Sequence, residues 1–429
     1  MSTHSTIDVQ ISLESPLLLG GRKLSGQCLE SLDYIPGRVI RGALATSLLE
    51  SRAHEPVPCR DGCDICDLLL KSGAAIFRNA YPCGKESTGS TPARMTQVRC
   101  KTRDDHPSFD TLTNRMVASL KGTLYEPRCP TCSDRVERRG GYLTDNGKKN
   151  PAHARMETVR VGIDRGRRTA AEEFLYSLSV HSEFDEDQEK TQFRGTIRCP
   201  SRLARDVARI LEERLHRLGG ATSRGLGAVS VMAKVQDKKN QDLVAQRVKR
   251  WNAHLASALQ AEGRKAILPV APHLARLATE STPDRLRGGK AGYFVIDLLS
   301  DAVFAEYTRV GDSLVSTGRQ DFVLGVEALA RQTGCSAPAQ LVTSFASPTY
   351  RAGWNATWGL PRPVDLLSVA GGVFVYWTDD LPAWVTSIEK LEEIGAGERV
   401  EEGLGHVEIC STIHLENRIH DTEKGAPRK

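Results

Sequence analysis

The sequence predicts an α+β fold made of two domains with antiparallel sheets. Strand-like and helix-like segments follow the order strand, helix, strands, helix, strand in the first half, and a similar series fills the second half. A glycine-rich turn between a helix and a strand occurs once in each half. The 429 residues also exceed the usual size of one hydrophobic core. We expect a first domain at 1–240, a second at 241–416 and a polar tail at 417–429.

The first half opens with a strand, because Ile7, Val9, Ile11 and Leu13 alternate with polar residues. Apolar residues at helical spacing then predict a helix over 39–49. Three strands are then expected, at 158–163, 174–184 and 192–199. An amphipathic helix follows, which begins at Ser201 and ends at Gly219, and the last strand is expected at 228–235. This order is the split βαβ pattern of a ferredoxin-like domain.

The second half of the chain shows a similar order of helices and strands, with a less regular pattern. Its periodic segments predict helices at 243–259 and 383–394 and strands at 292–299, 371–377 and 405–410. We therefore expect a second ferredoxin-like unit.

A large insertion is expected in the first domain, at about 52–156, where Gly, Pro, Cys and charged residues replace the periodic pattern. The chain carries a net charge of +5, and between Arg52 and Arg168 there are 22 Lys and Arg against 14 Asp and Glu. Positive charge gathered in one segment is typical of a surface that neutralises nucleic-acid phosphates, although a merely solvated basic face is the alternative.

The eleven cysteines favour a metal over disulfides. The N-terminus lacks the pattern of a secretory signal and no apolar run is long enough to cross a bilayer, so we expect a cytoplasmic protein outside the membrane. Two CxxC motifs predict one structural zinc site with four thiolate ligands: Cys63, Cys66, Cys129 and Cys132. Three further cysteines are possible substitutes: Cys59, Cys83 and Cys100.

The two glycine-rich turns are candidate phosphate sites. They read LGGATSRGLGAVSV at 218–231 and IGAGERVEEGLGHVEIC at 394–410. Glycines allow close approach to backbone N–H groups, and Arg224 or Arg399 can add a cation. Simple C-caps of helices are the alternative.

Together with YIPGRVIRGALA at 34–45, these turns resemble the RAMP superfamily of CRISPR-associated proteins. GERVEEGLGHV, GWNATWGLPRP and NAYP are similar to segments of the large RAMP subunit of type III-D effector complexes. The resemblance implies two ferredoxin-like (RRM-like) RAMP domains, with the zinc-stapled insertion in the first.

The resemblance also implies a non-catalytic subunit that caps the 5′ tag of the guide RNA (crRNA), as Cas-five-type subunits do. Its expected partners are the crRNA, other effector subunits (Cas-seven-like backbone and Cas-ten-like large subunit) and, indirectly, target RNA. Carried over by position, it places five residues on the guide RNA: Arg38, Arg41, Gly219, Gly220 and Arg224.

Further candidates for RNA contacts follow from the charge and the loops. Gly225 belongs to the first loop, and Arg399 in the second loop is flanked by acidic residues that repel phosphate. Four basic residues in and after the insertion are additional candidates: Lys101, Arg139, Arg160 and Arg165.

The sequence contains no convincing catalytic constellation, so we do not expect an enzyme. An endoribonuclease is the alternative. Asp33 directly precedes Tyr34, where related backbone subunits carry an aspartate that cuts target RNA, and His106 or His153 could act as general base in repeat processing.

Overall fold

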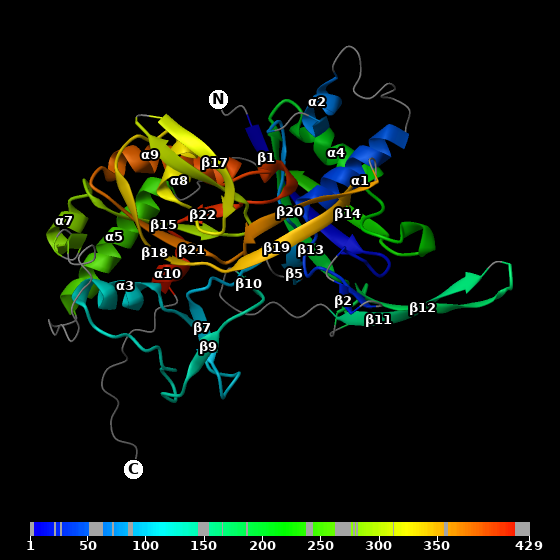
Figure 1. The fold of residues 1–429 in the computed structure, drawn as a ribbon, viewed down its shortest axis with the longest axis horizontal. Helices are drawn as coiled ribbons and strands as arrows, with labels where there is room; N and C mark the ends of the chain where they lie inside the picture. The colour runs from blue at the N-terminus through cyan, green and yellow to red at the C-terminus, as the bar shows by residue number, and fades with distance from the viewer. Residues whose placement is uncertain are drawn as a thin grey trace. The chain divides into compact units, whose positions relative to one another are not determined.

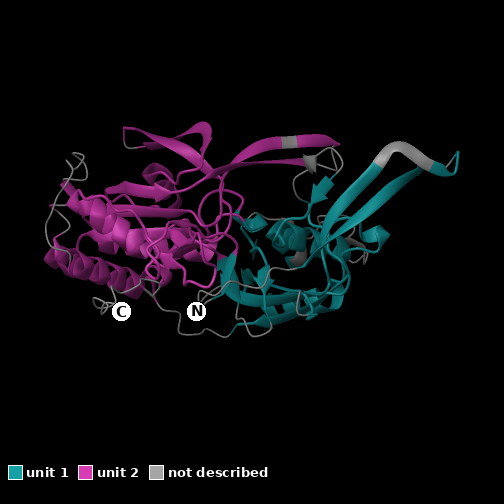
Figure 2. Cartoon of the chain, turned by 90° about the horizontal axis from the view of Figure 1, so that it is seen from below, with its two compact units in different colours: residues 1–91, 142–239, 400–403 teal, residues 92–141, 240–399, 404–429 magenta. Residues whose placement is uncertain are grey.

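The computed structural model shows two compact units, which Figure 2 colours separately. The structure describes residues 4–20, 23–25, 28–50, 63–70, 73–84, 89–144, 154–164, 166–185, 188–236, 243–261, 276–277, 279, 282–311, 313–355 and 359–416. Unit 1 contains Met1–Thr91, Tyr142–Lys239 and Val400–Gly403; unit 2 contains Pro92–Gly141, Asn240–Arg399 and Leu404–Lys429. Residues 92–141, expected within an insertion of the first domain, therefore cluster with unit 2.

The main sheet of unit 1 has the strand order β14-β1-β13-β4, with β5 also paired to β13, and its pairings are antiparallel. Its strands are β1 (His4–Leu13), β4 (Ile76–Phe77), β5 (Tyr81–Cys83), β13 (Gln192–Pro200) and β14 (Val229–Val235). The predicted alternation in β1 is confirmed, because Ile7, Val9, Ile11 and Leu13 are all fully buried.

Helices α1 (Gly37–Glu50) and α4 (Ala204–Arg214) contribute to the same core as β1, through Leu44 and Leu211 among others. A shorter helix, α2 (Asp64–Leu70), precedes β4. Helix α4 ends five residues before the predicted end, because the chain after it pairs as an extended segment: Val229 N donates to His216 O at 3.0 Å. Ser201, the predicted start, lies before the helix, and its hydroxyl accepts a hydrogen bond from the hydroxyl of Ser5 at 2.9 Å.

A second sheet of unit 1 has the order β11-β12-β3-β2, in which only β12 and β3 run parallel. Its strands are β2 (Lys23–Ser25), β3 (Cys28–Glu30), β11 (Arg155–Asp164) and β12 (Thr169–His181). Strands β11 and β12 form a long hairpin that extends away from the rest of unit 1 (Figure 1). A separate two-stranded sheet joins β6 (Ser90–Pro92) and β10 (Tyr142–Thr144).

The main sheet of unit 2 has the order β18-β21-β15-β22, again with antiparallel pairings. Its strands are β15 (Gly292–Leu298), β18 (Ala339–Phe345), β21 (Val373–Thr378) and β22 (Val407–Ile409). Every residue of β15 and β21 is buried, so both faces of these central strands are covered. The helices of the unit are α3 (Leu112–Lys121), α5 (Val244–Ala261), α7 (Pro283–Arg287), α8 (Val326–Thr333), α9 (Leu381–Ile394) and α10 (Ile413–Glu416).

Unit 2 also contains three small sheets. Two are hairpins: β16 (Phe304–Val310) with β17 (Ser313–Asp321), and β19 (Pro348–Asn355) with β20 (Leu360–Ser368). The third has the order β8-β7-β9 and is formed by β7 (Gln97–Cys100), β8 (Phe109–Asp110) and β9 (Val136–Arg138). The α+β class with antiparallel sheets is thus confirmed. Within the described part of the chain, no helix has the length and apolarity needed to span a bilayer.

Candidate metal centre and glycine loops

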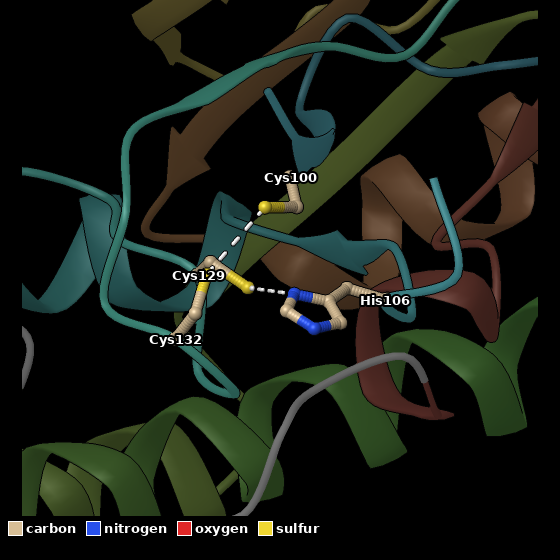
Figure 3. Close-up of side chains that lie close together, drawn as sticks. All are labelled: Cys100, His106, Cys129 and Cys132. Carbon is tan, nitrogen blue, oxygen red and sulfur yellow. Dashed lines mark hydrogen bonds between the residues drawn. The ribbon is translucent and has the colours of Figure 1, made fainter. Parts of the chain in front are cut away.

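Three cysteines and one histidine gather beside the small sheet of unit 2 (Figure 3). Cys100 ends β7, His106 lies in the loop before β8, and the CPTC segment supplies Cys129 and Cys132. One potential ligand atom from each residue lies within 4.8 Å of all the others. His106 Nδ1 is 3.3 Å from Cys129 Sγ, and Cys100 Sγ is 3.6 Å from Cys132 Sγ.

The donor set fits a metal ion. Three thiolates and an imidazole form the Cys₃His combination of tetrahedral structural zinc sites. Cys100 and Cys129 are only 1% exposed, so the chain holds their sulfurs away from solvent. The hydroxyl of Thr102, 3.3 Å from Cys100 Sγ, lowers the pKa of this thiol to about 6, which favours the thiolate that a metal requires.

The ligands converge because of the turn around CPTC. Cys129 N donates to Asp134 O at 2.9 Å and Ser133 N donates to Cys129 O at 2.7 Å, so the chain reverses between the two cysteines and β9. The register of β7 with β9 then sets Cys100 opposite Val136, next to this turn. Backbone pairing therefore builds the site.

The cluster differs from the predicted ligand set in two positions. Cys129 and Cys132 belong to the cluster together with Cys100, which was one of the three possible substitutes, and His106; Cys63 and Cys66 are not part of it. Cys63 accepts a hydrogen bond from Cys66 N at 3.3 Å at the start of α2 in unit 1. The ligand that was missed is His106, six residues after Cys100 in CKTRDDH, because this histidine was considered only as a general base.

The remaining ligand candidates are accounted for as follows. Cys83 is buried in β5, and burial raises the pKa of its thiol to about 11, as expected of a thiol packed in the core. Cys59 and His153 lie outside the described residues.

The first glycine loop is held by backbone bonds inside unit 1. Leu218 N donates to Gly227 O at 2.8 Å, and Gly220 N donates to Leu18 O at 2.8 Å. Ala221 has a φ of 56°, in the left-handed region, and it starts the 3₁₀ turn η1 (Thr222–Arg224). A Cβ on Gly219 would lie 2.2 Å from Leu18 O, so the loop requires glycine for its own packing.

The second loop has the same structure. Ala396 N donates to Gly405 O at 2.7 Å, and Glu398 N donates to Val303 O at 2.9 Å. Arg399 has a φ of 58° and precedes a second 3₁₀ turn, η2 (Val400–Glu402). The Leu218–Gly227 bond, the donor Gly220 and the left-handed Ala221 recur 178 positions further along the chain, as the Ala396–Gly405 bond, Glu398 and Arg399, which indicates an internal duplication.

The duplication also shows that the two loop arginines are not equivalent. Arg399 takes the position of Ala221, whereas the position of Arg224 is taken by Glu402. Arg224 is exposed and donates to the hydroxyl of Tyr176 at 2.7 Å. Arg399 forms an ion pair with Asp365 and is only partly exposed. The first loop therefore presents a more accessible cation than the second.

The two arginines predicted on α1 have different surroundings. Arg41 donates from Nε and Nη2 to Leu69 O, at 3.1 and 2.5 Å, and so ties α1 to the C-terminal turn of α2. Arg38 is half-buried on the same helix. The first N–H of the helix, on Gly37, donates to Asn79 Oδ1 at 2.9 Å.

The other predicted residues are spread over both units. Lys101 is exposed and Arg139 is half-buried at the β8-β7-β9 sheet, which we call the metal-centre sheet. Burial, together with the positive charge of Arg99, lowers the pKa of Arg139. Arg160 is half-buried on β11, and Arg165 lies outside the described residues. Gly225 has a φ of 85° and open space beside it, since no atom lies within 4 Å of an added Cβ.

Asp33 forms an ion pair with Arg155 of β11. The same guanidinium donates to Glu30 Oε1 at 2.8 Å and to Ser31 O at 3.0 Å. A carboxylate on the surface with a cation beside it is well placed to order this loop.

A buried charge network was not anticipated from the sequence. His414 of α10 lies between Asp110 of β8 and Asp297 of β15, with Nδ1 3.1 Å from Asp110 Oδ1 and Nε2 2.9 Å from Asp297 Oδ1. Arg94 Nε lies 3.8 Å from Asp297 Oδ1, and its Nη2 pairs with Glu408 at 2.6 Å. The network ties the metal-centre sheet to the main sheet of unit 2.

Comparison with known proteins gives structural neighbours only. No protein-family model matches the chain, and no curated protein does. The chain is similar to one in the cryo-EM structure of Type III-B Cmr-beta bound to cognate target RNA and AMPPnP, with 12% identity, 86% of each chain covered and a TM-score of 0.40. A structure of Type III-B Cmr-beta bound to cognate target RNA matches with 12% identity, 86% coverage of both chains and a TM-score of 0.37. Its apo state matches with 12% identity over 55% of this chain and 98% of that chain, with a TM-score of 0.28.

Proposed function

We propose that the protein is a non-catalytic guide-RNA-binding subunit of a type III CRISPR effector complex, built from two ferredoxin-like RAMP domains. The observation that carries this proposal is the duplicated glycine loop, which has the same backbone bonds in both units. The loops occupy the positions at which the sequence resembles RAMP proteins.

The topology of the two main sheets supports the fold part of the proposal. With β4 and β5 of unit 1 counted as one position, the last strand of each sheet pairs with the first, the first with the third, and the third with the second along the chain. A helix precedes the last strand in both, α4 before β14 and α9 before β22. This order is the one a split βαβ unit produces.

The first loop supports the RNA part. The guanidinium of Arg224 has five N–H donors, and the bond to Tyr176 uses one of them while fixing the orientation of the group. Gly225 leaves open space next to it, so an RNA backbone can approach closely. An oriented cation beside open backbone is suited to a phosphate, and Tyr176 offers a ring for base stacking.

The remaining parts of the proposal extend the sequence resemblance. The RNA is the 5′ tag of the crRNA, and the neighbours in the complex are the Cas-seven-like and Cas-ten-like subunits. We also propose that the Cys₃His cluster holds zinc, which would cross-link a segment with little core of its own.

The test is filter binding of tag-containing guide RNA to Arg224→Ala across a salt series. Affinity should fall, and the slope of log K against log salt should flatten by about 0.7, the value for one lost contact to single-stranded RNA. Arg209→Ala is the matched control, because Arg209 is an exposed arginine on α4 with an ion pair to Asp206. Equal affinities and slopes for both variants and the parent would place the RNA elsewhere.

A further inference from the structure

The sheet that carries the metal ligands also displays a row of cations. Lys101 N donates to Arg135 O at 3.0 Å, which continues the β7–β9 pairing one residue past Cys100 and Val136. Arg135 forms a backbone bridge with Arg128 on its other side. Residues directly opposite one another share a face of a sheet, so these three cations are neighbours in a row about 4.8 Å apart.

Alternation along the strands extends this row into a face. Arg99 lies two residues before Lys101, and Arg139 lies four residues after Arg135, so both are on the same side as the row. We call this set of five residues the basic face: Arg99, Lys101, Arg128, Arg135 and Arg139. Cys100, one residue before Lys101, is on the opposite side, toward the metal centre.

Internal partners neutralise only part of this charge. Arg99 pairs with Glu137 at 2.6 Å and with Asp104 at 3.3 Å, and Arg128 pairs with Glu126 at 3.0 Å. Among the described residues, Lys101, Arg135 and Arg139 have no ion pair. Lys101 and Arg135 are exposed and directly opposite each other, an arrangement of like charges that destabilises a sheet.

An anion that spans this row of cations reduces the repulsion between them. A single phosphate or a nucleotide is normally held in a concave site by converging donors, whereas this row is extended along a sheet surface. A polyanion with regularly repeated charges matches it better. The metal centre on the other side fixes the CPTC turn, and with it the positions of Arg128 and Arg135 on either side of that turn.

We propose that the basic face binds the phosphate backbone of single-stranded RNA, as a contact additional to the η1 loop. The proposal rests on the proposed function, because it takes RNA as the ligand of the chain. It adds a sequence-independent contact, since phosphates carry no base identity.

The experiment compares the full chain with the double variant Lys101→Gln and Arg135→Gln. Binding of a fluorescein-labelled, untagged single-stranded RNA is measured by anisotropy over a salt series. Affinity at low salt should fall by about tenfold, and the slope of log K against log salt should flatten by about 1.4, or about 0.7 for each lost contact. The control is Arg205→Gln with Lys234→Gln, which removes two exposed cations from unit 1 and should change neither quantity.

A second readout separates binding from folding. Removing two opposed like charges should leave the Tm equal to or above that of the parent, so weaker RNA binding would not come from unfolding. If the parent binds RNA and the basic-face variant behaves like its control, the inference is wrong while the proposed function stands. If the variant binds RNA normally but no longer assembles with its partner subunits, the face binds an acidic protein surface and the inference is also wrong. Failure of the parent to bind this untagged RNA would overturn the inference alone, whereas failure of the parent to bind tag-containing guide RNA would overturn the proposed function.

Discussion

The imidazole of His414 lies 3.1 Å from a carboxylate oxygen of Asp110, and both side chains are fully buried. A second carboxylate, on Asp297, lies 2.9 Å from the other ring nitrogen. Burial alone lowers the pKa of a histidine, but the two carboxylates outweigh it and raise the pKa of His414 to about 10. The protonated ring therefore neutralises carboxylates that would otherwise be buried as uncompensated charges.

Unit 2 should lose stability as the pH rises. An unfolded histidine has a pKa of about 6.5, so between about pH 6.5 and 10 the folded state holds a proton that the unfolded state has released. The stabilisation is complete below about pH 6.5 and is lost as the pH rises through 10. Urea unfolding followed by tryptophan fluorescence from pH 6 to 10 measures whether the free energy of unfolding falls as expected. Because Arg94 also lies near Asp297, it should make this fall smaller.

His414→Ala should lower the free energy of unfolding by about 3–5 kcal/mol at pH 7, because it removes the cation that lies between two buried carboxylates. His216→Ala, at an exposed site in unit 1, is the control and should change it by less than about 0.5 kcal/mol. Equal effects of the two substitutions would show that the network contributes no stability.

Metal content distinguishes the two possible ligand sets. Elemental analysis should find about one zinc per chain, because one tetrahedral site uses the four residues of the cluster. Cys100→Ser and His106→Ala should lower this content, whereas Cys63→Ser should leave it unchanged. Loss of zinc from the Cys63 variant alone would instead show that the two CxxC motifs together hold the metal.

Glycine substitutions test the packing of the first loop. Gly225 and Gly227 both have a positive φ, at 85° and 77°, so alanine carries a similar backbone penalty at either position. At Gly227 the new Cβ would also lie 2.0 Å from Leu218 O, whereas at Gly225 it meets open space. Gly227→Ala should therefore lower the Tm several degrees more than Gly225→Ala does. Equal shifts would mean that this close approach is not required.

Asp33→Ala tests the enzymatic alternative. We expect the assembled complex to cleave target RNA at the same sites as the parent, because Asp33 is engaged by Arg155 and no metal-binding carboxylate set surrounds it among the described residues. Mapping of the cleavage products with and without Mg²⁺ is the measurement. Loss of one specific cut in the variant would establish a nuclease role.

Much of the fold could be predicted from local patterns. The alternation of Ile7 to Leu13 and the helical spacing around Leu44 both report burial on one side, which is what short-range periodicity encodes. The region 304–368 gave no such signal. Its hairpins expose residues on both faces, so Val310, Tyr350 and Val364 are exposed although they lie on strands.

The candidate metal site was only half predictable. The CPTC spacing marks a metal-binding turn by itself, but Cys100 and His106 join it through the β7–β9 register, which is a long-range pairing. The His414 network could not be predicted from the sequence for the same reason. Its members Asp110, Asp297 and His414 come from separate elements, and none has a distinctive local pattern. The loop glycines were recognised, but their packing against Leu18 and Val303 required the fold.

The most direct test of RNA binding is to sequence the RNA that copurifies with the full chain when it is expressed with its genomic neighbours. The proposed function predicts guide RNAs that share one 5′ tag, retained by the parent and by Arg209→Ala and depleted in Arg224→Ala. Copurified RNA without a common tag, or none enriched over a column control, would contradict it.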